Sequence, residues 1–145
     1  MEDLLSDVYV APKLATIGSR FGAALLDFIL LVILFVIFGK LWGETSYEDG
    51  WHVNLSGLPA LAYYALGFVL MPLQEGISGK TLGKRVMGIH VKRKDNSDAG
   101  VGLSIARHIF DGIDCLFLVG IIVAASNQYR QRIGDLVAGT IVVKD

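Results

Sequence analysis

The sequence has 145 residues, of which 53% are hydrophobic and 19% are charged, and its mean hydropathy is +0.55. A soluble domain typically has about 45–50% apolar and about 25% charged residues, so this composition favours a membrane protein over a soluble one. The length predicts a single domain over residues 1–145, the single cysteine excludes an internal disulfide, and the net charge of −1 gives no indication of a nucleic-acid partner.

The first apolar segment, at about residues 20–40, predicts a transmembrane helix. Residues 21–39 contain one charged side chain, Asp27, and residues 28–38 have no polar face. Nineteen helical residues extend about 28 Å, which is close to the thickness of the hydrocarbon core of a bilayer. A buried helix of a soluble protein would instead show a polar side.

A second transmembrane helix is predicted at about residues 56–75. Residues 50–74 contain no Asp, Glu, Lys or Arg. Pro59 lies in the first turn, where proline is tolerated, and Pro72 is expected to kink or end the helix. The loop between the two helices has three acidic residues and one basic residue over 40–55, with aromatic residues typical of a membrane interface.

A basic loop follows at residues 76–102, and the positive-inside rule places it in the cytoplasm. It contains two acidic residues and six basic ones. The basic residues are Lys80, Lys84, Arg85, Lys92, Arg93 and Lys94. Residues 86–92 and 139–144 are short and rich in β-branched side chains, which predicts two strands. Because a lone strand leaves its backbone groups unpaired, we expect these two to pair on the cytoplasmic side.

The third apolar segment, at about residues 104–126, allows two topologies. A full third span would place the C-terminus outside, but Arg130 and Arg132 favour a cytoplasmic C-terminus. A re-entrant or partly interfacial segment that bends at Gly112 or Gly120 resolves this conflict. The predicted fold class is therefore an all-α membrane protein with about three transmembrane or re-entrant segments and a small two-stranded β element.

Charged residues inside apolar segments are the candidate functional residues. Arg20 and Asp27 share a helix face but are about 10 Å apart, so each needs a partner from elsewhere. We expect Asp27 to be buried and bonded to a basic or hydroxyl group of another segment. Arg107, Asp111 and Asp114 also share a helix face, and Arg107 could pair with Asp111. The three aspartates are candidate cation or proton sites. The alternatives are a structural clamp between helices for Asp27 and an amphipathic interfacial face for Asp111 and Asp114.

Three motifs resemble those of the RDD family of membrane proteins, which is named for one arginine and two aspartates. The arginine and the first aspartate match Arg20 and Asp27 in GSRFGAALLD. A glycine-rich segment after the second span matches SGKTLGKRVMGIHV, and the second aspartate matches Asp135 in RIGDLVAGTIVV. Arg107 matches an arginine that is usual early in the third segment. The family often has histidine before the second aspartate, whereas this chain has Gly134.

The resemblance implies a transport role, because some family members are similar to sodium/proton antiporters. On this hypothesis the aspartates carry a monovalent cation or proton. Their charge partners are Arg20, Arg107 and Asp135, and a homo-oligomer encloses the pathway. The alternative is a membrane scaffold or accessory module whose basic loop docks anionic lipid or a partner protein. No nucleophile–base set, metal-ligand spacing or cofactor motif is found in the sequence, so we expect neither enzymatic activity nor a cofactor. The expected location is a bacterial inner membrane, which the chain crosses more than once.

Overall fold

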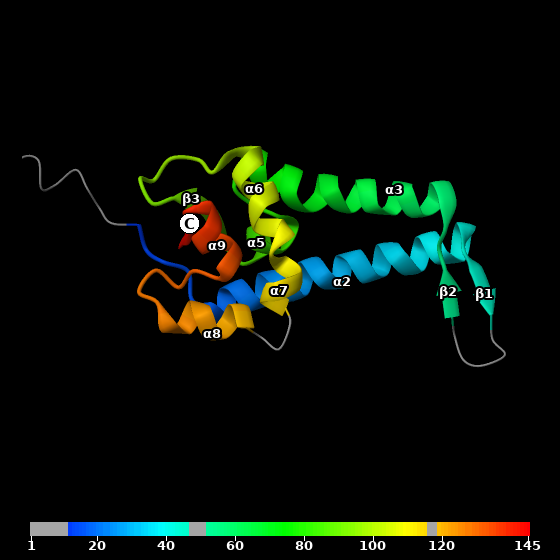
Figure 1. The fold of residues 1–145 in the computed structure, drawn as a ribbon, viewed down its shortest axis with the longest axis horizontal. Helices are drawn as coiled ribbons and strands as arrows, with labels where there is room; N and C mark the ends of the chain where they lie inside the picture. The colour runs from blue at the N-terminus through cyan, green and yellow to red at the C-terminus, as the bar shows by residue number, and fades with distance from the viewer. Residues whose placement is uncertain (1–11, 47–51, 116–118) are drawn as a thin grey trace, which may run out of the picture.

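The computed structural model describes residues 12–46, 52–115 and 119–145. The two ends of the molecule are distinct, with one small sheet at each end of the two longest helices (Figure 1). The elements in chain order are α2 (Ile17–Trp42), β1 (Glu44–Ser46), β2 (His52–Asn54), α3 (Gly57–Phe68), the π-helix η1 (Val69–Leu73), α4 (Gln74–Ser78), α5 (Leu82–Val86), β3 (Ile89–Arg93), α6 (Gly100–Ile109), α7 (Asp111–Cys115), α8 (Val119–Ser126), α9 (Ile133–Ala138) and β4 (Thr140–Lys144).

Helix α2 contains the first predicted span and extends beyond it at both ends. Thr16 caps its N-terminus by accepting a hydrogen bond from the backbone N–H of Ser19, at 3.1 Å. Its 26 residues extend about 39 Å, which exceeds the hydrocarbon thickness of about 30 Å. Ala23, Asp27 and Gly39 are the buried residues of this helix. Most of its large apolar side chains therefore face outward.

The second predicted span is a continuous helical segment made of α3, η1 and α4. Pro72 was expected to kink or end this helix, but the chain passes through it as a π-helix. Proline lacks the N–H group that an α-helix needs at that position. The wider π-turn compensates, because the N–H of Gln74 bonds to the carbonyl of Val69, five residues earlier. The helix thus continues to Ser78 without a break.

Two helical segments among the described residues are long and apolar enough to cross a membrane, Ile17–Trp42 and Gly57–Ser78. Only 11% of the apolar window in each is buried inside the molecule. Phe28 and Tyr64, for example, are 63% and 71% exposed. In a soluble protein such helices would be covered, so this exposed apolar surface is typical of helices that contact lipid.

A third full span is not supported. The segment at 104–126 forms three short helices, α6, α7 and α8, and none of them meets the length for crossing a bilayer. Figure 1 shows that α6 and α8 both lie toward the end of the molecule that carries β3, away from the β1–β2 end. The chain therefore returns after α8 to the end from which α6 started.

The predicted pairing of the two short strands is confirmed. Strands β3 and β4 pair antiparallel, with Val91 opposite Val142. The segment before α2 joins the same sheet, since the N–H of Ala15 donates to the carbonyl of Val142 at 2.9 Å. These residues form the buried apolar core together with Ala23, Ile89 and Ala99. The small β1–β2 hairpin at the other end was not predicted, and residues 47–51 of its loop lie outside the described residues.

Candidate functional site: a buried ion network

Five charged side chains from five helices meet inside the molecule beside the β3–β4 sheet. They are Arg20 of α2, Glu75 of α4, Lys84 of α5, Arg107 of α6 and Asp135 of α9, and we call them the ion network. Each helix contributes one charge, so the network links segments that are far apart in the sequence. Its two acids are completely buried.

Arg107 is the centre of the ion network. Its Nε donates to Asp135 Oδ1 at 2.8 Å, and its Nη1 donates to Glu75 Oε1 at 2.5 Å. The guanidinium is therefore shared between two carboxylates that approach it from different helices. Arg107 is 1% exposed, which is tolerable for a charged group only when such partners are present.

The two acids each have a second basic partner. Arg20 forms an ion pair with Asp135, and Lys84 forms one with Glu75. The hydroxyl of Ser104 also donates to Glu75, at 3.1 Å. Both carboxylates are thus held by charged hydrogen bonds on each oxygen, the strongest class of hydrogen bond in proteins.

These charges determine the ionisation of Asp135. Burial would by itself raise the pKa of Asp135, but the positive charges of Arg107 and Arg20 outweigh this effect and hold that pKa well below its usual range. The carboxylate is therefore ionised throughout the physiological pH range. A group that is always ionised can hold an ion pair permanently but cannot pick up and release a proton.

Asp27 lies outside the ion network and links α2 to α5. The hydroxyl of Thr81 donates to Asp27 Oδ2 at 2.5 Å, and the N–H of Gly83 donates to Asp27 Oδ1 at 2.7 Å. The carboxylate is 8% exposed. The structure thus buries Asp27 and gives it a hydroxyl partner from another segment, as the sequence predicted.

Comparisons with known proteins identify the family of this chain. The model of the RDD family matches residues 14–139. The chain belongs to the RDD family. It is also 29% identical, over 137 residues, to "Uncharacterized protein YckC" of Bacillus subtilis (strain 168), and this match covers 90% of the chain and 84% of the relative. No solved structure matches. Together with the two exposed apolar helices, membership of the RDD family indicates a membrane protein.

Two of the residues that match the RDD motifs are partners in this fold, since Arg20 is paired with Asp135. Gly134, which replaces the family's frequent histidine, lies where α9 approaches α6 closely. A Cβ atom at Gly134 would be 2.6 Å from the carbonyl oxygen of Arg107. A side chain at this position would separate the two helices, so the departure from the family pattern is accommodated by tighter packing.

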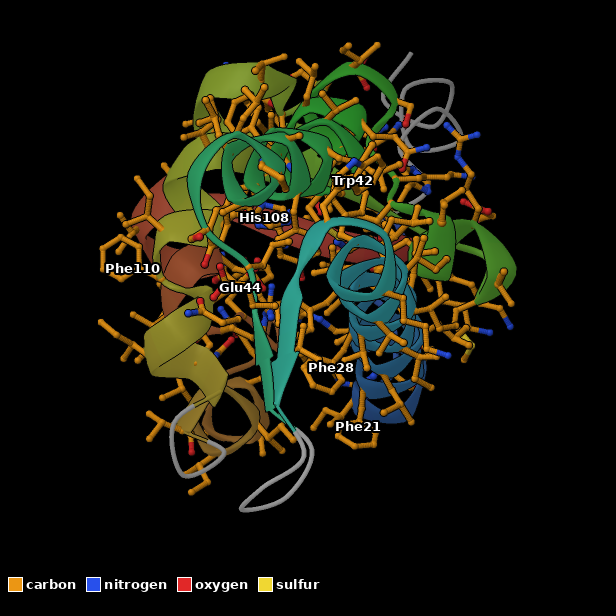
Figure 2. The ribbon with its side chains drawn as sticks, turned by 90° about the vertical axis from the view of Figure 1, so that its right-hand side faces the viewer. Phe21, Phe28, Trp42, Glu44, His108 and Phe110 are labelled. Carbon is orange, nitrogen blue, oxygen red and sulfur yellow. The ribbon has the colours of Figure 1, made fainter. Side chains whose placement is uncertain are left out.

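The expected pairing of Arg107 with Asp111 does not form. Helix α6 ends at Ile109, and α7 begins at Asp111, so the two residues are not on one continuous helix. Arg107 points to Glu75 and Asp135 instead, whereas Asp111 lies 3.4 Å from a guanidinium nitrogen of Arg132. Viewed along the long axis, Phe110 at this break points away from the helices, and His108 lies between them (Figure 2).

Asp114 is bonded to the start of α9. Its two oxygens accept hydrogen bonds from the N–H groups of Ile133 and Gly134, at 3.0 and 3.3 Å. These N–H groups open α9 and have no partner within that helix. Asp114 therefore fastens α7 to the start of α9. The three aspartates that are candidate cation or proton sites thus contact different parts of the fold. Asp27 of α2 contacts the start of α5, whereas Asp111 and Asp114 contact the start of α9.

The six basic residues of the 76–102 loop do not form one surface. Lys84 lies in the ion network, and Lys80 is paired with Asp145 at 2.7 Å. Arg85 lies on α5, while Lys92, Arg93 and Lys94 lie on or beside β3. The ammonium group of Lys94 is 5.0 Å from the centre of the Tyr129 ring, within the range of a cation–π contact.

Glu75 is the functional candidate that sequence reasoning missed. Residues 50–74 contain no charged side chain, and Glu75 is the next residue. An acid that ends a long apolar segment, directly before a basic loop, was the available signal. Its partners Lys84 and Arg107 are nine and 32 positions away in the chain, so no helical spacing connects the three.

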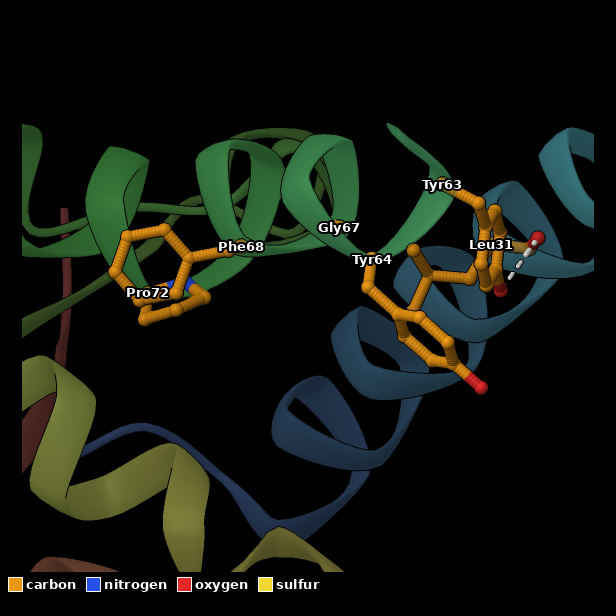
Figure 3. A pocket seen from close by; sticks show the side chains of 6 residues that line it. All are labelled: Leu31, Tyr63, Tyr64, Gly67, Phe68 and Pro72. Carbon is orange, nitrogen blue, oxygen red and sulfur yellow. Dashed lines mark hydrogen bonds between the residues drawn. The ribbon is translucent and has the colours of Figure 1, made fainter. Parts of the chain in front are cut away.

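One apolar groove lies outside the ion network among the described residues. This groove, of about 290 Å³, lies between α2 and α3 and has no charged lining residue (Figure 3). The hydroxyl of Tyr63 donates across it to the carbonyl of Leu31 at 3.3 Å. Within residues 12–46, 52–115 and 119–145, no group of three or more His, Cys, Asp or Glu side chains could hold a metal ion. The ion network is therefore the main candidate site.

Proposed function

We propose that this RDD protein is a non-transporting, multi-pass membrane module in which buried charges lock the helices together and present a basic end for docking at the membrane surface. The observation that supports this role is the saturation of the buried acids by partners within the chain. Glu75 and Asp135 are bound by guanidinium and ammonium groups, and Asp27 is bound by a hydroxyl and a backbone N–H.

A carrier needs a carboxylate that can exchange its partner for an ion or a proton. Exchange at Glu75 would leave the buried Arg107 without one of its two acids, which is costly in a water-poor interior. Exchange at Asp27 would release the contact between α2 and α5. A static lock uses these contacts without breaking them, so the geometry supports a scaffold better than a carrier.

Transport of a monovalent cation or proton is the second candidate. It is favoured by the positions of two acids in the candidate membrane helices. Asp27 lies in the first of these helices and Glu75 near the end of the second. Ionisable residues at such positions commonly mark ion pathways. Two membrane helices are too few to enclose a pathway, so this role would require several copies of the chain.

We expect the purified protein to cause no cation or proton flux in liposomes. Vesicles that contain a pH-sensitive or sodium-sensitive dye would be compared with and without the protein after an ion gradient is applied, and an ionophore serves as the positive control. Because the buried acids keep their partners, both protein-containing and protein-free vesicles should respond only to the ionophore. Protein-dependent flux that disappears in a folded Glu75→Gln variant would instead establish the transport role.

The proposed orientation places the β3–β4 sheet and the basic loop in the cytoplasm and the β1–β2 hairpin outside. The reason is the excess of basic residues at 76–102 and of acidic residues at 40–55. Single cysteines at positions 46 and 97, in a Cys115→Ser background, would be treated in intact cells with an impermeant thiol reagent. We expect labelling at position 46 only; labelling at 97 alone means the reverse orientation.

A further inference from the structure

Helix α5 lies at the depth where lipid headgroups meet hydrocarbon, if α2 crosses the bilayer as proposed. A hydrocarbon core of about 30 Å accommodates about 20 helical residues. Counting back from Trp42, an aromatic residue typical of the interface, this length reaches the region of Ala23. Helix α5 packs on α2 at this point, because Gly83 lies against Ala23 and Asp27.

The outer face of α5 is apolar. Gly83 faces α2, whereas Leu82 and Val86 face outward and are 39% and 75% exposed. Ile77, at the end of the second membrane helix, is 73% exposed and precedes α5 in the chain. The contact of Arg85 with Ser78 brings the end of α4 next to α5, so water would meet three large apolar side chains in this region. Acyl chains of the lipid would cover them, as they cover the apolar face of an interfacial helix.

Arg85 is an exposed guanidinium on the same short helix. Its Nη2 donates to the hydroxyl of Ser78 at 3.3 Å, and no carboxylate of the described residues forms an ion pair with it. Its neighbours are different, because Lys84 is bound to Glu75 and Lys80 to Asp145. Arg85 therefore has positive charge available for an external anion, next to Leu82 and Val86.

We infer that Arg85 binds the phosphate of an anionic phospholipid whose acyl chains lie against Ile77, Leu82 and Val86. This inference rests on the proposed membrane module and identifies the lipid class that its basic end docks. A guanidinium is well matched to a phosphate, and a long arginine side chain can extend from apolar surroundings to the headgroup level. Free inorganic phosphate would use the charge but leave the apolar face uncovered.

The test measures phospholipid binding to the purified full-length protein in a non-ionic detergent by native mass spectrometry. Phosphatidylglycerol and phosphatidylcholine are added in equimolar amounts. The wild type should prefer phosphatidylglycerol, and Arg85→Gln should weaken that binding roughly fivefold, as expected for one basic residue at an anionic surface. Arg85→Lys, which keeps the charge, should keep the preference.

Lys144→Gln is the control, because Lys144 is also an exposed basic residue but lies on β4, outside the 76–102 loop. It should leave phosphatidylglycerol binding unchanged. Equal binding of both lipids by the wild type, or equal losses in the two glutamine variants, overturns the site. Displacement of phosphatidylglycerol by inorganic phosphate also overturns it. These outcomes are independent of ion flux in liposomes, so failure of the lipid site is distinguishable from failure of the proposed non-transporting role.

Discussion

Replacing Arg107 with methionine is expected to destabilise the fold by about 3–5 kcal/mol, the typical cost of breaking a buried ion pair from one side. Methionine fills much of the space but leaves Glu75 and Asp135 without the group that joins them. Each acid keeps one basic partner, so the loss comes from incomplete compensation of buried charge. The thermal midpoint in detergent and the fraction of monodisperse protein on size exclusion would both fall.

Arg93→Met is the matched control, since it removes the same charge from an exposed strand position. Its stability should stay within about 0.5 kcal/mol of the wild type, as is usual for surface substitutions. The double variant Glu75→Gln/Arg107→Met should lose less stability than the sum of its single variants, because the two residues share one contact. An Arg107→Met protein as stable as the control contradicts the structural role of the ion network.

Replacing Gly83 with alanine is expected to separate α5 from α2. The new Cβ would be 2.1 Å from the carbonyl oxygen of Ala23 and 2.9 Å from the carboxylate of Asp27. The first of these atoms belongs to the backbone of a long helix and cannot move alone. Overpacking of this kind costs about 1–3 kcal/mol, and the hydrogen bonds of Asp27 would be strained in addition. The measurement is again the thermal midpoint in detergent.

Gly102→Ala tests whether this cost is specific to the contact. Gly102 lies in α6, and a Cβ atom there would have no heavy atom within 4 Å. Gly102 lies in the first turn of α6, and alanine has a higher helix propensity than glycine, so this variant should be as stable as the wild type or slightly more stable. If both alanine variants have the same thermal midpoint, the close approach of α5 to α2 does not require glycine at position 83.

Local patterns were sufficient to predict several parts of the fold. The two apolar helices follow from composition over about twenty consecutive residues, which is a local property. The pairing of β3 with β4 followed from the need of each isolated strand for a partner, since only two strong strand segments were evident. The burial of Asp27 was predictable for the same kind of reason, because a carboxylate in an apolar helix needs a partner.

Patterns along one helix gave wrong expectations where the chain changes direction. The Arg107–Asp111 spacing suits an ion pair only if the helix continues, and here it breaks at Phe110. The third apolar segment was compatible with one span or with a re-entrant segment, and its division into α6, α7 and α8 depends on what each half packs against. Asp114 illustrates this, because its partners are the first N–H groups of α9.

By itself, the sequence determined the membrane class of this protein, its two long apolar helices and the residues that carry charge in or near them. Tertiary structure alone decided which charges meet. Glu75 joins Lys84 and Arg107, and Asp135 joins Arg20, across separations that no periodicity encodes. The physical reason is that a buried charge is stabilised by whichever opposite charge the packing of distant helices brings to it, and that packing depends on contacts along the whole chain.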